Sequence, residues 1–239
     1  MIGIISQVRM TSTRLPAKVM KAVNGIPLLQ YHVDRLRKSD FPVYIATTTN
    51  KEDDPIEEFC VKNQINFFRG SEHDVLSRYH GLANKFDLKV IVRVTSDCPL
   101  IDGQLIRSSY LKHQRDLQEN FYLCNTQKRT YPRGFDFEIF SRSTLEEMFS
   151  RATLDFEKEH VTPYIWKSHP EKFSIIHITR PDDASEFRIT VDEPDDFKIV
   201  EKLILEHQAH LKTAEEIIAI LRRHPELKEI NAHVEQKKV

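Results

Sequence analysis

Short apolar runs alternate with helical patterns along the first 117 residues, and this alternation restricts the fold more than any other feature of the sequence. The runs have the length of buried strands, and the segments between them repeat apolar residues at helical spacing. Such a chain forms a mostly parallel α/β sheet with helices on both faces, joined by right-handed crossovers. The expected strands are 2–6, 42–47, 65–68 and 89–94, and the expected helices are 28–36, 53–60, 75–86 and 105–117.

After residue 120 the expected strands and helices no longer alternate regularly. We find no internal repeat and no linker there, so we expect one domain over residues 1–239 with an insertion at 120–180. The expected strands are 121–126, 134–140, 173–179 and 187–191, and the expected helices are 143–149, 157–166, 194–206 and 214–222.

The charge balance and the cysteine content limit the classes of partner. The formal net charge is −1, so there is no overall electrostatic reason to expect binding to nucleic acid or to an anionic membrane. The three cysteines are widely spaced and form no CxxC motif, which indicates a reducing compartment. No run reaches membrane length and the N-terminus lacks a signal-peptide pattern, so we expect a cytoplasmic protein without membrane insertion.

A basic loop follows the first strand directly. Arginine forks, a mobile lysine charge, hydroxyls and backbone N–H groups are the donors that bind a polyphosphate. The loop also lies where open α/β sheets bind ligands, beyond the carboxyl end of a strand. An ordinary solvated loop remains the alternative, because neither glycine-rich phosphate fingerprint is present. The cations are Arg9, Arg14 and Lys18, and the hydroxyls are Thr11, Ser12 and Thr13.

Two aspartates, Asp97 and Asp192, each follow an apolar strand and precede a proline by two residues. Carboxylates at this edge of a sheet suit Mg²⁺, which takes oxygen ligands and leaves the rest to water and substrate phosphates. Capping of the following helices is the alternative role for both residues.

A third acidic site is formed by Asp136 and Glu138, which alternate with aromatic residues. This spacing predicts that both carboxylates point to one face of a strand. Because adjacent carboxylates repel, we expect a compensating cation or a sugar that offers hydroxyls. The alternative is an exposed face of an edge strand.

Together these motifs resemble the CMP-sugar synthetases, which activate acidic sugars with CTP; residues 4–18 are similar to their signature. They resemble most closely the branch of the spore coat polysaccharide biosynthesis protein F family of cytidylyltransferases. The resemblance runs nearly end to end, and its motifs occur in the same order. The further segments that carry it are 93–102, 132–138, 159–165, 190–195 and 231–238.

The resemblance implies a Rossmann-like fold of the nucleotide-diphospho-sugar transferase type and transfer of CMP from CTP to an acidic sugar, with release of pyrophosphate. It also implies a homodimer, with residues 120–180 contributing the acceptor site and the dimer interface. The implied catalytic residues are Arg9, Arg14, Lys18 and Asp97, with Mg²⁺ on Asp97 and Asp192. Nucleotide binding is assigned to Ser6, Gln7, Arg9, Ser12, Thr13, Arg14, Lys18, Arg93 and Ser96, and acceptor binding to Arg133, Asp136, Glu138 and His160.

Two departures from the family pattern affect the nucleotide. Ser6-Gln7-Val8 replaces the small-residue run of many relatives, and Ser96 replaces a glycine before the metal aspartate. Three alternatives therefore stay open: a nucleotidyltransferase for another nucleotide or acceptor, a glycosyltransferase that binds a finished nucleotide sugar, and a catalytically silent scaffold.

Overall fold

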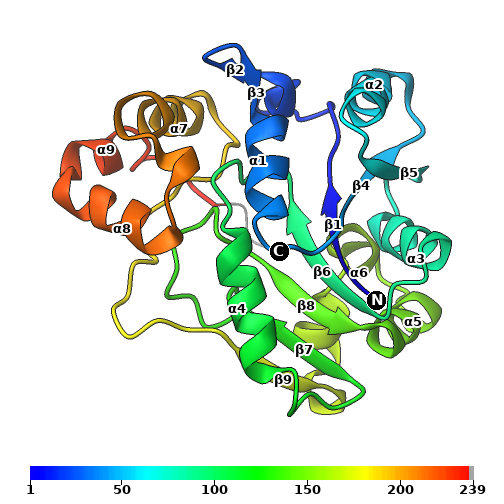
Figure 1. Ribbon diagram of the computed structural model, residues 1–239. Coiled ribbons are helices and arrows are strands. Elements are labelled where there is room, and N and C mark those ends of the chain that lie inside the picture. Colours follow the sequence, from blue (N-terminus) through cyan, green and yellow to red (C-terminus); the bar gives the residue numbers. More distant parts are fainter. Residues whose placement is uncertain (237–239) are drawn as a thin grey trace.

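A seven-stranded sheet forms the centre of the molecule in the computed structural model, which describes residues 1–236 (Figure 1). The end of the resembling tail, residues 237 and 238, lies outside the described residues. The strand order is β5-β4-β1-β6-β8-β7-β9. The strands are β1 (Ile2–Gln7), β4 (Val43–Thr48), β5 (Asn66–Gly70), β6 (Val90–Thr95), β7 (Phe121–Cys124), β8 (Glu138–Ser141) and β9 (Ser174–His177), and a separate hairpin pairs β2 (Ala22–Val23) with β3 (Ile26–Pro27).

Strands β5, β4, β1 and β6 are parallel, so their carboxyl ends lie at one edge of the sheet, the upper edge in Figure 1. Strand β8 is antiparallel to both β6 and β7, and β9 is parallel to β7. The predicted mostly parallel α/β sheet is confirmed. Because β8 runs in the opposite direction, its first residue lies at the same edge as the carboxyl ends of its neighbours.

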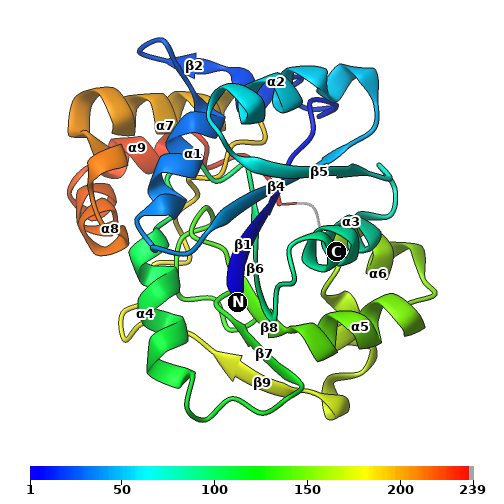
Figure 2. The same ribbon diagram turned by 45° about the vertical axis from the view of Figure 1, so that its right-hand side comes forward.

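Helices cover both faces of the sheet (Figure 2). Ile4 packs in the core cluster beneath α1, α4, α7 and α8, whereas Ile5 packs in the opposite cluster with α3 and α5. This burial on two faces explains why the parallel strands are apolar throughout. The helices are α1 (Leu28–Arg37), α2 (Asp54–Lys62), α3 (Val75–Lys85), α4 (Gly103–His113), α5 (Arg142–Arg151), α6 (Asp155–His160), α7 (Pro194–His207), α8 (Ala214–Arg223) and α9 (Pro225–Glu229), and the shorter turns are η1 (Lys18–Met20), η2 (Lys51–Asp53), η3 (Tyr164–Ser168), η4 (Pro170–Lys172) and η5 (Ala209–Leu211).

The expected strand at 134–140 is only half formed, because β8 begins at Glu138. The side chain of Asn125 takes the hydrogen bonds that a strand ladder would use: its Nδ2 donates to the carbonyl of Phe135 (2.7 Å) and its Oδ1 accepts from the N–H of Phe137 (3.0 Å). Asp136 therefore precedes the strand, and the prediction that it belongs to one strand with Glu138 is wrong.

Two further expected elements are shorter than predicted. In place of the strand at 187–191 there is a single bridge between Arg133 and Arg188. The N–H of Val191 bonds instead to the carbonyl of Asp97 (2.7 Å). The expected helix at 157–166 ends at His160, because Val161 adopts φ 70°, and a π-helical turn follows in η3. Left-handed backbone at a β-branched residue ends a right-handed helix.

Within residues 1–236, no helix combines the length and the apolar character needed to cross a membrane.

Candidate active site

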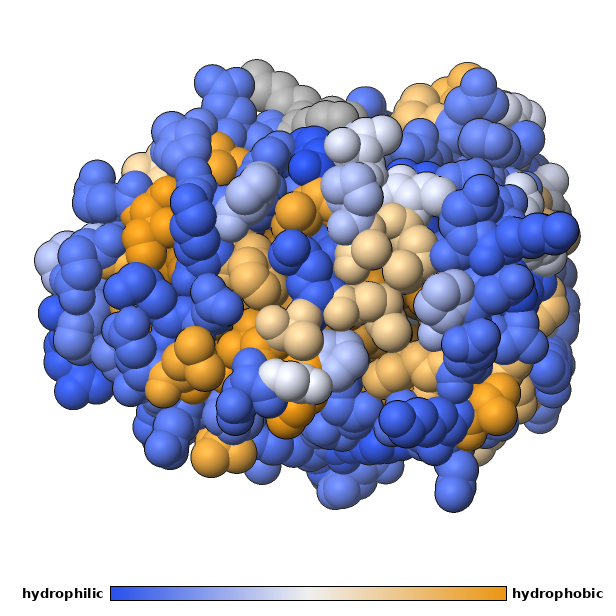
Figure 3. Space-filling model, turned by 90° about the horizontal axis from the view of Figure 1, so that it is seen from above, coloured by the Kyte–Doolittle hydropathy of each residue, from blue (hydrophilic) through white to orange (hydrophobic). Residues whose placement is uncertain are grey.

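A cavity of about 910 Å³ opens at the carboxyl edge of the parallel strands. Figure 3 looks onto this end of the molecule, where hydrophilic side chains predominate around smaller apolar patches. The cavity brings together most of the residues predicted to bind the nucleotide. Those that line it are Gln7, Arg9, Ser12, Thr13, Arg14, Lys18, Arg93 and Ser96, and the two predicted metal ligands, Asp97 and Asp192, line it as well.

The basic loop after β1 is held in place from two sides. The backbone N–H of Met10 donates to the buried carboxylate of Asp53 (2.6 Å) at the start of α2. Glu72 accepts hydrogen bonds from the hydroxyl of Thr11 (3.0 Å) and from Arg9 (3.3 Å). The loop is therefore fixed over the cavity by carboxylates, which is unlike the ordinary solvated loop considered as its alternative.

Lys18 joins the two aspartates that the sequence places 95 residues apart. Its Nζ lies 2.8 Å from Asp192 Oδ1 and 3.5 Å from Asp97 Oδ2. Burial alone would lower the pKa of Lys18, but the two carboxylates outweigh it and raise this pKa above its usual value. Burial acts in the opposite sense on Asp192, whose pKa is nevertheless lowered by Lys18, Arg14 and Arg188. Lys18 and Asp192 are therefore both charged at neutral pH.

Neither aspartate has the capping role considered as the alternative. The side chain of Asp102 caps α4, accepting from the N–H groups of Gln104 (2.9 Å) and Leu105 (3.2 Å). At the start of α7 the N-cap residue is Glu193, whose N–H donates to Asp196 (3.0 Å). Asp97 and Asp192 are consequently left with side-chain oxygens at the cavity.

Direct contacts between the segments after β6 and before α7 bring these two aspartates together. The carbonyl of Asp97 accepts from the N–H of Val191 (2.7 Å) and the hydroxyl of Thr190 (3.1 Å). Arg188 donates to the second oxygen of Asp192 (2.9 Å). The backbone position of Asp97 and the orientation of the Asp192 carboxylate are therefore set by the protein.

The donor set fits a hard divalent cation. Two carboxylates joined by one lysine match the way Mg²⁺ binds, through one or two carboxylates and substrate phosphates. Among residues 1–236 no cluster of three or more acidic, histidine or cysteine side chains is placed to hold a metal. Further ligands would come from a substrate or from water.

A chain of hydrogen bonds lies beneath the cavity. His32 Nδ1 lies 2.8 Å from the carbonyl of Cys98, His32 Nε2 lies 2.8 Å from Ser6 Oγ, and Ser6 Oγ lies 2.7 Å from Ser96 Oγ. Because a carbonyl only accepts, Nδ1 donates, Nε2 accepts from Ser6, and Ser6 accepts from Ser96. Burial lowers the pKa of His32 to about 4, so the ring is neutral. Ser6, predicted to bind the nucleotide, is fully buried and does not line the cavity.

A second cavity, of about 600 Å³, adjoins the first and shares Arg93 and His160 with it. It is lined by all the residues predicted to bind the acceptor, namely Arg133, Asp136, Glu138 and His160. Burial lowers the pKa of His160.

Two of these acceptor-site residues already have protein partners. Glu138 is buried and accepts hydrogen bonds from Arg93, Tyr122 and Thr162. Asp136 pairs with Arg129 (2.5 Å). The compensating cations expected for the two carboxylates are thus arginines of the protein. Arg133 is different, because within the described residues no carboxylate lies within ion-pair distance of it.

Sequence reasoning missed Glu72 and Arg78, which also line the first cavity. Glu72 lies in a connecting loop, and nothing in its local sequence marks it. Arg78 had a usable signal: it falls on the apolar stripe of α3 with Val75 and Leu82, where a charged residue is unusual.

The chain is similar to a known protein family and to individual proteins over most of its length. The sequence profile described as "Cytidylyltransferase" matches residues 2–239. Spore coat polysaccharide biosynthesis protein SpsF of Bacillus subtilis is 31% identical over 232 residues, which cover 93% of this chain and 94% of that protein. The 3-deoxy-manno-octulosonate cytidylyltransferase of Francisella tularensis subsp. novicida is 26% identical over 175 residues, covering 66% of this chain and 65% of that protein.

Among solved structures, that of a cytidylyltransferase from Leptospira borgpetersenii serovar Hardjo-bovis superposes with a TM-score of 0.91 at 32% identity. The superposition covers 100% of this chain and 98% of the other. These similarities confirm the resemblance found in the sequence and the predicted fold class.

Proposed function

This chain belongs to the cytidylyltransferase family and is a nucleotidyltransferase, and on that premise we propose that it transfers CMP from CTP to an acidic sugar with release of pyrophosphate. The acceptor belongs to the ulosonic or nonulosonic acid type, and the product serves the synthesis of a surface polysaccharide. The names of two relatives support this proposal, since one acts in spore coat polysaccharide biosynthesis and the other on 3-deoxy-manno-octulosonate.

The observation that carries the proposal is the contact of Lys18 with both Asp97 and Asp192 at the end of the basic loop. A triphosphate with a divalent cation brings both charge signs at once. Its phosphate oxygens would bind Lys18, and the two carboxylates released by Lys18 would bind the cation. A catalytically silent scaffold has no physical need for a lysine and two carboxylates whose mutual contacts a metal nucleotide can replace.

In the proposed reaction an acceptor hydroxyl oxygen attacks the α-phosphorus of CTP, and the bond to pyrophosphate breaks in line. The hydroxyl proton leaves to solvent. Mg²⁺, held by Asp97 and Asp192, would supply charge neutralisation at the α-phosphate. Lys18, Arg9 and Arg14 hold the triphosphate and stabilise the charge that accumulates on pyrophosphate. Positioning and electrostatics account for most catalysis of phosphoryl-type transfer.

The acceptor binds in the second cavity. Arg133, which has no carboxylate partner within residues 1–236, offers a planar fork of donors for the carboxylate of the sugar. Thr126, Gln127 and Asp136 line the same cavity and offer partners for sugar hydroxyls. The shared wall at Arg93 and His160 keeps the acceptor next to the nucleotide.

We further propose that the protein is a cytoplasmic homodimer. Support for the dimer comes from Phe149 and Leu154, two large apolar side chains of the 120–180 region that are 42% and 50% exposed. The free cysteines at 60, 98 and 124 support a reducing compartment. Sedimentation at micromolar concentration tests the dimer, and a single monomeric species would refute it.

Thermal unfolding with CTP, UTP, GTP or ATP, with and without Mg²⁺, tests the nucleotide. A ligand at 100 times its Kd adds about 2.7 kcal/mol to the unfolding free energy. For a chain of this length each kcal/mol moves Tm by about 2–4 °C. We expect stabilisation by CTP that Mg²⁺ strengthens, followed by pyrophosphate release when an acidic sugar is added. A response to a finished nucleotide sugar alone would favour the glycosyltransferase alternative.

A further inference from the structure

Arg78 differs from the other deeply buried arginines of the described chain in its lack of partners. It is 2% exposed, yet its Nε has no hydrogen-bond partner, and its Nη1 makes one long bond, of 3.4 Å, to the carbonyl of Ala46. No carboxylate of residues 1–236 lies within ion-pair distance of it. Burial lowers the pKa of Arg78.

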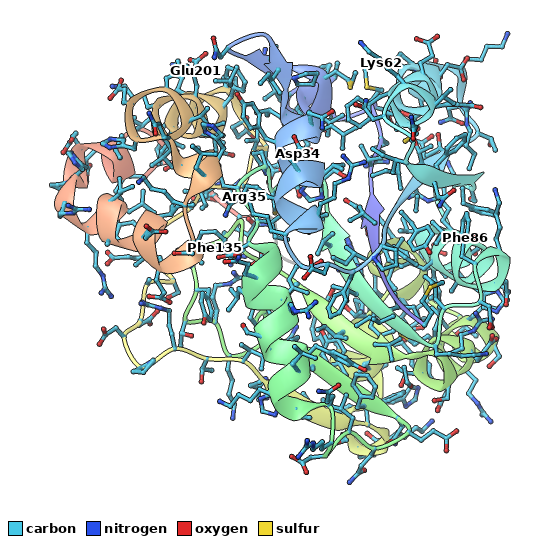
Figure 4. All side chains as sticks on the ribbon, viewed as in Figure 1. Asp34, Arg35, Lys62, Phe86, Phe135 and Glu201 are labelled. Carbon is cyan, nitrogen blue, oxygen red and sulfur yellow. The ribbon has the colours of Figure 1, made fainter. Side chains whose placement is uncertain are left out.

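Arg35 provides the contrast. It is also 2% exposed and comes from α1 (Figure 4), but it donates to four backbone carbonyls, those of Ile101, Ala209, His210 and Lys212. Arg35 is therefore a satisfied structural arginine. A buried guanidinium without such acceptors is costly, unless a ligand supplies them.

Arg78 lies at the end of the first cavity that is remote from the aspartates. Its partner carbonyl belongs to β4, and β1 separates β4 from β6, the strand that leads to Asp97. Adjacent strands are about 4.8 Å apart, so β4 and β6 are separated by about 10 Å. The apolar residues Val8 and Val75 line the cavity together with Arg78.

The Arg78 end of the first cavity is suited to bind the flat base of a nucleotide. With the α-phosphate near Asp97 and the triphosphate under the basic loop, the nucleoside is left to extend toward β4 and α3. Valine side chains pack against a ring, and a guanidinium can donate two parallel hydrogen bonds to one edge of it. Cytosine presents two adjacent acceptors, O2 and N3, whereas uracil presents O2 beside an N3–H donor.

From this geometry we infer that Arg78 reads the O2/N3 edge of cytosine and sets the preference for cytidine over uridine nucleotides. The inference rests on the proposed function, and names the residue that selects its nucleotide. Arg78 would donate to both acceptors of cytosine, and its N–H would oppose the N3–H of uracil.

The test measures the binding of CMP and of UMP by calorimetry, which requires neither turnover nor an acceptor. We expect wild-type protein to prefer CMP. Arg78→Gln and Arg78→Lys should each reduce the ratio of the CMP to the UMP affinity by roughly 10- to 100-fold, the range that corresponds to one lost charged hydrogen bond. Arg9→Gln is the matched control, since a phosphate-binding residue weakens both ligands equally. Arg37→Gln, on the exposed face of α1, should change neither.

A folded Arg78→Gln or Arg78→Lys variant that keeps the wild-type ratio would overturn the inference while leaving the proposed reaction intact. If Arg78→Gln fails to fold, Arg78→Lys decides, because lysine keeps the charge and loses the fork. A wild-type protein that binds UMP as well as CMP would overturn the inference too. Absence of pyrophosphate release from CTP with every acidic sugar, despite selective CMP binding that depends on Arg78, would instead refute the proposed reaction alone.

Discussion

The basic loop over the first cavity and Arg133 in the second cavity differ in how their positive charges are balanced. In the first, each cation of the basic loop contacts a carboxylate: Arg9 contacts Glu72, Arg14 contacts Asp192, and Lys18 contacts both aspartates. In the second, Arg133 has no such partner among the described residues. The first cavity is thus suited to a ligand that brings both charge signs, such as a nucleotide with its metal. The second is suited to a simple anion.

Asp97→Asn should have the largest effect on this comparison, because it removes a charge from the pair that Lys18 balances. We expect kcat to fall by about 1,000-fold, the upper range for loss of one group that stabilises transition-state charge. Pyrophosphate release measures this fall, and circular dichroism checks the fold. Asp34→Asn, on the exposed face of α1 (Figure 4), is the matched control and should retain full activity. Near-normal turnover in Asp97→Asn would remove Asp97 from the mechanism.

Arg133→Gln should act on the second cavity alone. We expect the KM for an acidic acceptor to rise by roughly 10- to 100-fold, since a charge-assisted hydrogen bond is lost. The KM for CTP should stay unchanged in the same steady-state assay. Arg107→Gln, whose side chain is 40% exposed on α4, serves as the control. An equal rise in both KM values would mean that the two cavities do not separate the two substrates.

The charge pairing of the first cavity should also appear in the dependence of stability on pH. Asp192 has a lowered pKa in the folded state, so its stabilising contribution is complete above the unfolded value of about 3.9 and is lost as the pH falls through the folded pKa. Lys18 has a raised pKa, so its contribution is complete below about pH 10.4 and is lost as the pH rises through its folded value.

We therefore expect Asp192→Asn to lower Tm by several degrees at pH 7, since a broken buried ion pair costs about 3–5 kcal/mol. The difference from wild type should begin to shrink below about pH 4, where Asp192 becomes protonated in the unfolded state, and should be lost as the pH falls through the lower pKa of the folded state. Thermal scans between pH 3 and pH 8 measure the Tm difference at pH 7 and its decrease at low pH. A difference that stays constant over this range would indicate that the charge of Asp192 contributes nothing to stability.

The smallest expected effect concerns the floor of the first cavity, where Ser6 and Ser96 share a hydrogen bond. Ser6→Ala, Ser96→Ala and the double variant form a cycle whose coupling energy should lie at about 0.5–3 kcal/mol, as for other contacting residues. Denaturant unfolding gives the three values. Additive effects would mean that the two hydroxyls are independent.

The sequence was a good guide to the parallel half of the molecule and a poorer one to residues 120–191. In the first half each strand packs on both faces, so an apolar run is sufficient to identify it. In the second half side chains replace ladder bonds, as Asn125 does before β8, and the backbone at Val191 bonds to Asp97 instead of a neighbouring strand. The periodicity of apolar residues does not reveal where other hydrogen bonds replace those of a strand ladder.

The same limit explains which site residues were predicted. Motif residues such as Asp97 and Asp192 could be placed at one edge because strand ends meet there. The pairing of Glu138 with Arg93 depends on the antiparallel direction of β8, which apolar alternation does not reveal. The burial of Ser6 depends on His32, which comes from α1 and approaches from the neighbouring layer.

The hydrogen-bond chain from Ser96 through Ser6 to His32 also has an evolutionary consequence. Both serines are departures from the pattern of many relatives, and both are buried; the Ser96 hydroxyl bonds to Ser6, whereas Ser6 also bonds to His32. A lineage that reverted Ser96 to glycine would leave Ser6 without its donor. Ser96 depends on Ser6 for its side-chain partner, so sequences that carry serine at position 96 should also carry serine at position 6.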